Sequence, residues 1–197
     1  MLKGNREERI QGLRIFCEYR DSRSFPLLLP LLDQPCPVER MSVVYALGRN
    51  PCPSAVEKLV SLLETDDNAY VRRATAWSLA NYDNQIVLKP LINALKNDVA
   101  AVRLWSSSSL AEIGNVSLEN AQLAAEQLLI SLKIDNEPGV RSNCIWSLCR
   151  LYEKLNNTFQ ESFVDECTKI ALFDKEPSVM EEAKTALDSM GMQGFYN

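Results

Sequence analysis

A ten-residue phrase occurs three times in the chain, and this repetition constrains the fold more than any other feature. YVRRATAWSL occupies residues 70–79, GVRSNCIWSL occupies residues 139–148, and a looser copy, AVRLWSSSSL, occupies residues 101–110. A catalytic motif is normally present once, because a pocket needs one nucleophile and one base. A recurring phrase is instead typical of a structural unit that stacks on copies of itself. The sequence therefore predicts a repeat protein.

The arginine of the phrase sets the register of the repeats, whose spacings are 31, 32, 31, 38 and 39 residues. This period fits two helices of about ten to fifteen residues joined by tight turns, and the longer spacings indicate extended second helices in the fourth and fifth units. We predict one all-α domain over residues 1–197, a right-handed α-solenoid of five to six helical hairpins. The equivalent positions are Arg9, Arg40, Arg72, Arg103, Arg141 and Met180, and the units are expected at about 6–35, 36–66, 67–98, 99–135, 136–174 and 175–197.

Each unit contains a first helix, which begins near the Val-Arg pair, and a second helix after a turn. In the third unit, Val71, Ala74 and Trp77 form an apolar stripe at helical spacing, and IVLKPLINALK supplies a second, amphipathic helix. Asp or Asn precedes several first helices, where a short side-chain oxygen is expected to cap exposed backbone amides. Pro138 and Pro177 fit the first helical turn, because that amide has no partner within the helix.

The composition disfavours an autonomous enzyme and a nucleic-acid partner. The chain has no histidine, which removes Ser-His-Asp and Cys-His machinery and imidazole metal ligands. A net charge of −5 and a pI of about 4.9 disfavour binding to a polyanion. The charge is uneven, because residues 1–51 carry 8 − 6 = +2 and residues 136–197 carry 6 − 10 = −4. This gradient either orients a partner or belongs to a merely solvated surface.

No segment approaches the roughly 20 continuous apolar residues of a membrane span. The N-terminal sequence MLKGNREERIQGL is charged and lacks an apolar signal region. We therefore expect a cytoplasmic protein without a membrane span.

The six cysteines are expected to be free thiols that bind no metal within one chain. Four of them lie in helical patterns, where they pack as small hydrophobic residues. Cys36 and Cys52 each precede a proline and flank a helix of about twelve residues, so they lie about 18 Å apart, too far to share one metal ion. A single exposed thiol could still complete a cluster at an interface with another chain. The four helical cysteines are Cys17, Cys144, Cys149 and Cys167.

Large aromatic residues recur at one position of the first helix, namely Tyr45, Trp77 and Trp146. In the fourth unit this position is Ser108, and Trp105 lies one turn earlier on the same face. Such an exchange of large and small residues is typical of a core, so we expect the aromatic residues to be buried. The alternative is a platform for an aromatic ligand. The repeated arginines are expected to pair with an aspartate or carbonyl of a neighbouring unit, and the alternative for them is anion binding.

Two stretches carry a resemblance to a known family. VRRATAWSLANYDNQIVLKPLINAL (71–95) and EERIQGLRIFCEYRDSRSFPLLLPLL (7–32) resemble the HEAT-like repeats of the phycobilin lyase family, and the similarity extends over about residues 6–190. The chain also looks like cyanobacterial HEAT proteins that associate with an A-type iron–sulfur carrier. The resemblance implies HEAT-like hairpins, and no lyase catalytic signature can be carried over to residues of this chain.

For function, the resemblance implies one subunit of an E/F-type phycobilin lyase, a phycobilisome-processing factor, or an accessory protein for iron–sulfur carriage. A bilin or an iron–sulfur cluster would then be held only together with a partner, which would be a phycobiliprotein, a lyase partner subunit or an iron–sulfur carrier. The chain alone is expected to hold no cofactor and no metal.

The leading hypothesis is a non-enzymatic scaffold, adaptor or chaperone that binds another protein along its concave face. Second helices usually line that face in stacked helix pairs. Residues at i, i+4 and i+7 of three second helices share a helix face, and the apolar residues between them, such as Leu59 and Leu91, should point into the stack. A solvated helix face is the alternative. The predicted partner-binding residues are Glu57, Ser61 and Glu64, then Lys89, Asn93 and Lys96, then Glu126, Ile130 and Lys133.

Overall fold

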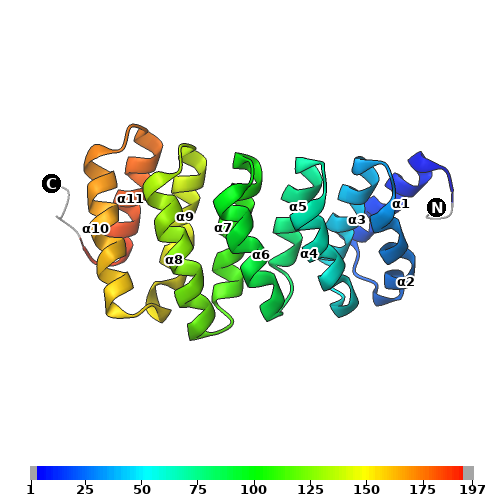
Figure 1. Ribbon diagram of the computed structural model, residues 1–197, viewed down its shortest axis with the longest axis horizontal. Helices are drawn as coiled ribbons and strands as arrows, with labels where there is room; N and C mark the ends of the chain where they lie inside the picture. Colours follow the sequence, from blue (N-terminus) through cyan, green and yellow to red (C-terminus); the bar gives the residue numbers. More distant parts are fainter. Residues whose placement is uncertain (1–3, 193–197) are drawn as a thin grey trace.

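The computed structural model describes residues 4–192, and within that range the chain forms helices and turns without a strand. Figure 1 shows the helices standing side by side in one elongated stack, with the N-terminus at one end and the C-terminus at the other. The predicted all-α solenoid is confirmed.

The described residues form eleven α-helices in two alternating sets, one helix of each set per layer. Short 3₁₀ turns lead into α2, α4 and α6 and follow α2 and α9. The first helices are α1 (Arg6–Glu18), α3 (Pro37–Arg49), α5 (Ala69–Leu79), α7 (Ala100–Gly114), α9 (Pro138–Leu151) and α11 (Pro177–Ser189). The second helices are α2 (Phe25–Leu28), α4 (Val56–Thr65), α6 (Leu88–Asn97), α8 (Leu118–Ile134) and α10 (Asn157–Phe173).

The lengths of the second helices explain the uneven repeat period. α8 and α10 have 17 residues each, whereas α4 and α6 have 10, so the predicted extension of the fourth and fifth units is confirmed. In the first layer, Pro26 lies in the first turn of α2, where proline is tolerated, whereas Pro30 follows the end of the helix, because proline lacks an amide donor and crowds the preceding turn. The second helix there is reduced to α2 and the 3₁₀ helix Leu29–Asp33.

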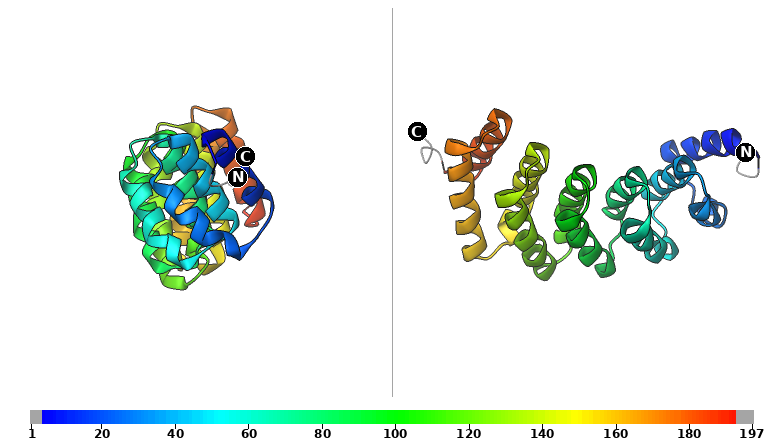
Figure 2. Two further views of the ribbon diagram at one scale, coloured as in Figure 1. Left: turned by 90° about the vertical axis from the view of Figure 1, so that its right-hand side faces the viewer. Right: turned by 45° about the horizontal axis from the view of Figure 1, so that its top comes forward.

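The stack is curved, and the two sets of helices lie on opposite sides of the curve. In the right-hand view of Figure 2 it forms an arc that opens upward, with the first helices along the upper, inner side and the second helices along the lower, outer side. Successive first helices pack directly against one another from α1 to α11, whereas successive second helices touch much less. The concave surface is therefore lined by the first helices.

Small residues allow the first helices to approach one another closely. A Cβ atom added to Gly48 of α3 would lie 3.2 Å from the backbone of Ser78 in α5, so only glycine fits there without displacement. The buried hydroxyls of Ser109 and Ser147 donate to the carbonyls of Ala76 and Ser107 in the preceding first helix, at 2.8 and 2.9 Å. On the other side of the layer, the leucines predicted to point into the stack are buried: Leu59, Leu63, Leu91 and Leu95.

Candidate protein-binding surface

The nine predicted partner-binding residues are all exposed, as the i, i+4, i+7 spacing requires. They lie on α4, α6 and α8, which are second helices and therefore run along the outer side of the arc. Their predicted place on the concave surface is wrong. The physical reason is that helices with small contact residues approach one another more closely and therefore lie on the inner side of a curved stack. In this chain these are the helices that carry the Val-Arg pair. Whether these nine residues bind a partner stays a prediction, now for the convex face: Glu57, Ser61, Glu64, Lys89, Asn93, Lys96, Glu126, Ile130 and Lys133.

Two of these predicted residues meet in a hollow between α4 and α6. Glu64 and Asn93 line a cleft of about 340 Å³ that also exposes Arg72 and Asp98. Lys133 lies at the rim of a larger cleft, about 450 Å³, between the ends of α8 and α10. The outer side of the arc thus has grooves between layers, with a mixed polar lining.

A hollow of about 300 Å³ on the inner side is formed by first helices alone. Its lining comes from α7, α9 and α11, and consists of Ser108, Gly139, Ser142, Asn143, Trp146 and Glu182. The positions that face the concave surface can therefore be read off the register in every layer. By this register, Tyr45, Trp77 and Trp146 occupy the same inward-facing position.

For this reason, the prediction that the recurrent aromatic residues are buried in the core is wrong for Trp105 and Trp146 and is confirmed only in part for Tyr45 and Trp77. Trp146 is 40% exposed and Trp105 36% exposed, whereas Tyr45 and Trp77 are half-buried. A helical stripe faces solvent when the helix lines the inside of a curve, because only its flanks and back pack on other helices. The structure instead places these side chains on the concave surface as part of an aromatic face.

Arginine side chains stack on these aromatic rings. The guanidinium of Arg49 lies 5.5 Å from the ring centre of Trp77, which in turn tilts against Tyr45 with ring centres 5.4 Å apart. In the fifth layer, Arg150 lies 5.0 Å from the ring centre of Trp146 and forms an ion pair of 2.9 Å with Glu112. Cation–π contacts of this kind hold a planar, charged group flat on the surface.

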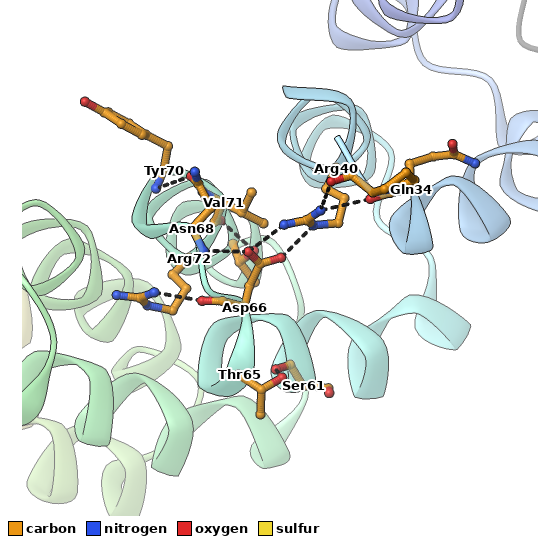
Figure 3. Close-up of polar contacts among 11 residues, drawn as sticks. Gln34, Arg40, Ser61, Thr65, Asp66, Asn68, Tyr70, Val71 and Arg72 are labelled. Atoms are coloured by element: carbon orange, nitrogen blue, oxygen red, sulfur yellow. Dashed lines mark hydrogen bonds and ion pairs between the residues drawn. The ribbon is translucent and has the colours of Figure 1, made fainter. Parts of the chain in front are cut away.

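The repeated arginines hold neighbouring segments of the stack together, as predicted. Arg72 donates through Nε and Nη2 to both carboxylate oxygens of Asp98, at 2.8 and 2.7 Å, and through Nη1 to the carbonyl of Asp66. Figure 3 shows the layer before it, where the carboxylate of Asp66 accepts from Arg40. Asp66, Asp98 and Asp135 are thus each held by one arginine through the side chain and by the next arginine through the backbone carbonyl. The ion pairs of this ladder are Arg9–Glu39, Arg40–Asp66, Arg72–Asp98, Arg103–Asp135 and Arg141–Asp174.

The ladder aspartates are therefore not helix caps, which corrects part of the sequence prediction. The carboxylate of Asp135 accepts from Arg103 and from the backbone amide of Glu137, in the turn before α9. Burial alone would raise the pKa of Asp135, but these hydrogen bonds and the arginine charges outweigh it and hold that pKa below its ordinary value. Asn68 does cap α5, accepting from the amides of Tyr70 and Val71.

The cysteines lie apart from any metal-binding cluster, since no group of three or more Cys, Asp or Glu residues in the described range could hold a metal ion. The six thiols are free in the structure. Burial raises the pKa of the half-buried Cys149 to about 11 and raises the pKa values of Cys144 and Cys167. Within residues 4–192, none of the helices combines the length and the apolar character needed to cross a membrane.

Comparison with known protein families identifies the type of repeat. The sequence matches HEAT repeats over residues 2–80 and 56–149. The chain belongs to the HEAT-repeat family. Comparison with curated proteins gives no significant match, so the narrower likeness to phycobilin lyase repeats stays a hypothesis.

Solved structures with a similar fold cover nearly the whole HEAT-repeat protein. An engineered protein is 20% identical, with a TM-score of 0.67, over 96% of this chain and 95% of its own. A designed armadillo repeat protein in complex with the peptide (KR)4 is 17% identical, with a TM-score of 0.67, over 100% of this chain and 96% of its own. At such identities the likeness shows the fold alone, which is a helical-repeat solenoid.

Sequence reasoning missed Arg49, Arg73 and Arg150 on the concave surface, and it considered an exposed aromatic surface with Trp105 and Trp146 only as the alternative to burial. The signal that could have identified them is the small size of their neighbours. The run Ser106–Ser109 in α7 cannot form a bulky core, so it marks a helix in close contact with the helices beside it.

Proposed function

We propose that this HEAT-repeat protein is a non-enzymatic scaffold, an adaptor or a chaperone, that binds a partner protein along its concave surface. The observation that carries the proposal is the exposure of large aromatic side chains on the inner helices. Trp105 and Trp146, from successive layers, are both at least one-third exposed, and Trp146 lines the hollow that spans three layers. Tryptophan, tyrosine and arginine are enriched among the residues that contribute most of the binding free energy at protein interfaces. The packing of the helix stack does not require Trp105 and Trp146 to be exposed.

A solenoid with a curved inner surface suits an elongated partner better than a small molecule. The hollows on both sides are shallow and shared between layers, whereas small-molecule sites are usually deep and enclosed. The designed armadillo repeat protein of similar fold holds a peptide. That observation supports the mode of binding by analogy of fold.

Affinity capture from a native-host extract, with the captured proteins identified by mass spectrometry, tests the proposal. The double variant Trp105→Ala/Trp146→Ala should lose the specific partner. The matched variant on the convex side, Lys89→Glu/Lys96→Glu, should retain it, because those lysines lie on the opposite face. Both variants should unfold within a few degrees of the wild-type protein, since all four side chains are at least one-third exposed. Loss of the partner in the lysine variant and its retention in the tryptophan variant would transfer the site to the convex face.

Two narrower functions come from the resemblance and are proposals of the same kind: a subunit of a phycobilin lyase or phycobilisome-processing factor, and an accessory protein for iron–sulfur carriage. In each case the partner would supply or share the cofactor. The visible absorbance of the protein purified from its native host separates them. Bilin bands support the first, sulfur-to-iron charge-transfer bands support the second, and a colourless preparation supports a scaffold that handles protein alone.

A further inference from the structure

The concave surface has two arginine–aromatic stacks whose charge is balanced differently. In the fifth layer, the guanidinium over Trp146 belongs to Arg150 and is neutralised by Glu112. In the second and third layers, the guanidinium over Trp77 belongs to Arg49, whose side chain forms no ion pair or hydrogen bond with any residue in the described range. Arg49 and Arg150 occupy the same position of the repeat, although Arg150 stacks on a ring of its own helix and Arg49 on a ring of the next one. The two arginines are therefore matched by position and differ in their counter-ion.

Arg73 is a second arginine without a counter-ion, one helix further along. Its guanidinium lies 5.5 Å from the ring centre of Tyr70, and its Nε is buried without a hydrogen-bond partner among the described residues. By register, Arg73 corresponds to Ser142 and Tyr70 to Gly139, both of which line the inner hollow in the fifth layer. Arg73 and Tyr70 therefore face the same concave surface. The side chain of Arg73 is only partly buried, so the rest of its guanidinium remains available to an acceptor from a partner.

Among residues 4–192, no carboxylate takes the place of the missing counter-ion at Arg49 or Arg73. At Arg49 the register position of Glu112 is occupied by Glu18, the last residue of α1, and this carboxylate is beyond ion-pair distance from Arg49 in the structure. The ladder aspartates are already engaged by other arginines. The N-terminal half of the concave surface thus presents aromatic rings with two uncompensated positive charges.

We propose that α3 and α5 bind an acidic, extended segment of a partner protein, with its carboxylates on Arg49 and Arg73 and its backbone over Trp77 and Tyr70. The proposal deepens the proposed function and rests on it. Arg49 lies at the end of α3 and Arg73 near the start of α5, so their repeat positions differ by eight residues, about 12 Å along the helix axis. Because adjacent first helices lie about 8–10 Å apart, the two positions are about 15 Å apart, which an extended chain spans in four to five residues. Acidic residues at i and i+4, which face the same side of an extended chain, therefore match the two arginines. A protein segment is favoured over a long polyanion because residues 136–197 carry a net charge of −4 and would repel it.

Fluorescence anisotropy with short synthetic peptides tests the inference on the whole chain. The probe is a rhodamine-labelled peptide of about twelve residues with glutamate at every fourth position in a Gly-Ser background. Its matched control has glutamine in place of glutamate, and (KR)4 serves as the opposite-charge control. We expect the glutamate probe to bind at least tenfold more tightly than the other two, with an affinity that falls as salt is added.

The variants use the matched stack as an internal control. Arg49→Gln and Arg73→Gln should each weaken binding of the glutamate probe about fivefold, and the double variant should abolish its preference over the glutamine probe. Arg150→Gln should leave it unchanged, because Glu112 already neutralises that arginine. Glu112→Gln frees Arg150 and should strengthen binding. Circular dichroism confirms that each variant is folded.

Three outcomes would overturn the inference: equal binding of the glutamate and glutamine probes, an effect of Arg150→Gln as large as that of Arg49→Gln, or stronger binding of a single-stranded oligonucleotide than of the glutamate probe. Failure of the proposed function gives a different pattern. If the natural partner requires Trp105 and Trp146 but is indifferent to both arginine changes, the concave scaffold stands and only its acidic specificity is wrong. If capture is indifferent to all concave variants, the proposed function itself fails.

Discussion

The arginine ladder allows a sharp test of how the layers are held together. Asp135 is the best position, because its side chain is only 6% exposed and accepts from Nε and Nη2 of Arg103, both at 2.7 Å. Asp135→Asn keeps the shape but converts one of the two acceptor oxygens into a donor that faces the guanidinium. A hydrogen bond to a charged group contributes about 1.5–3 kcal/mol, and loss of one partner of a buried pair leaves the other charge uncompensated. We expect a loss of about 2–4 kcal/mol at pH 7.

Urea unfolding followed by far-UV circular dichroism measures this loss. The matched control is Asp21→Asn, because Arg23 forms the same bidentate ion pair with Asp21, through Nε and Nη2, but its side chain is 89% exposed. Solvent screens that pair, so its removal should leave the unfolding midpoint unchanged within error. The slope of each transition must be compared as well, because a repeat protein whose layers uncouple no longer unfolds in one step. An Asp135→Asn midpoint equal to that of the wild type would refute the structural role of the ladder.

The same pair predicts a dependence on pH. The pKa of Asp135 is lowered in the folded state, so the aspartate stabilises the fold fully above its ordinary pKa of about 3.9 and loses this contribution as the pH falls through the lowered value. The stability gap between the wild type and Asp135→Asn should therefore be largest near pH 7 and narrow below about pH 4. A gap that stays constant down to pH 3 would show that the ionised carboxylate is not what matters.

Three further predictions concern the inner helices and the thiols. Gly48→Ala should destabilise the protein by about 1–3 kcal/mol in a urea titration, because the new Cβ would lie 2.5 Å from the Trp77 ring. Gly139→Ala, whose new Cβ would have its nearest neighbour at 3.4 Å, should instead stabilise the protein by up to about 1 kcal/mol. Equal effects of the two substitutions would contradict the close approach of α3 and α5. Ultraviolet titration should show one tyrosine that ionises at about pH 12 and is absent in Tyr82→Phe, since burial raises the pKa of Tyr82 to about 12 while its hydroxyl donates to the carbonyl of Leu47. Ellman's reagent at pH 8 should leave Cys52, Cys144 and Cys167 unmodified in the native protein and reach all six thiols in guanidinium, and rapid native labelling of Cys144 would disprove its burial.

Much of the fold was predictable because its signals are local and repeated. Pairs such as Arg72 and Asp98 recur in four successive units, with each aspartate five or six residues before the next repeat position. A chain that stacks similar layers must bring such a pair together in each of them. The leucines of the second helices follow the 3.6-residue period, and no other element competes for their apolar face. The extension of α8 and α10 follows directly from the longer spacing between arginines.

The side of the curve on which each helix lies was not predictable from the same signals. A repeating series of helix, turn and helix has no natural starting point, so labelling the Val-Arg helix as first did not decide which helix lies inside. The decision comes from the size of the contact residues, such as Gly48 and Ser109, which determines how closely neighbours approach. The exposure of Trp146 follows from that geometry, because hydrophobic periodicity does not distinguish a ring packed in a core from one on a concave surface.

The unequal packing of the two helix sets has a mechanical consequence. The inner helices are joined at every step by close contacts and by an ion pair, whereas the outer helices barely touch across the grooves between layers. The helix stack should therefore resist stretching along its concave side and deform more easily along its convex side. Small changes in curvature would widen or narrow the outer grooves and leave the spacing of the inner side chains almost constant. The concave surface would thus present its side chains at a nearly constant spacing while the curvature of the solenoid changes.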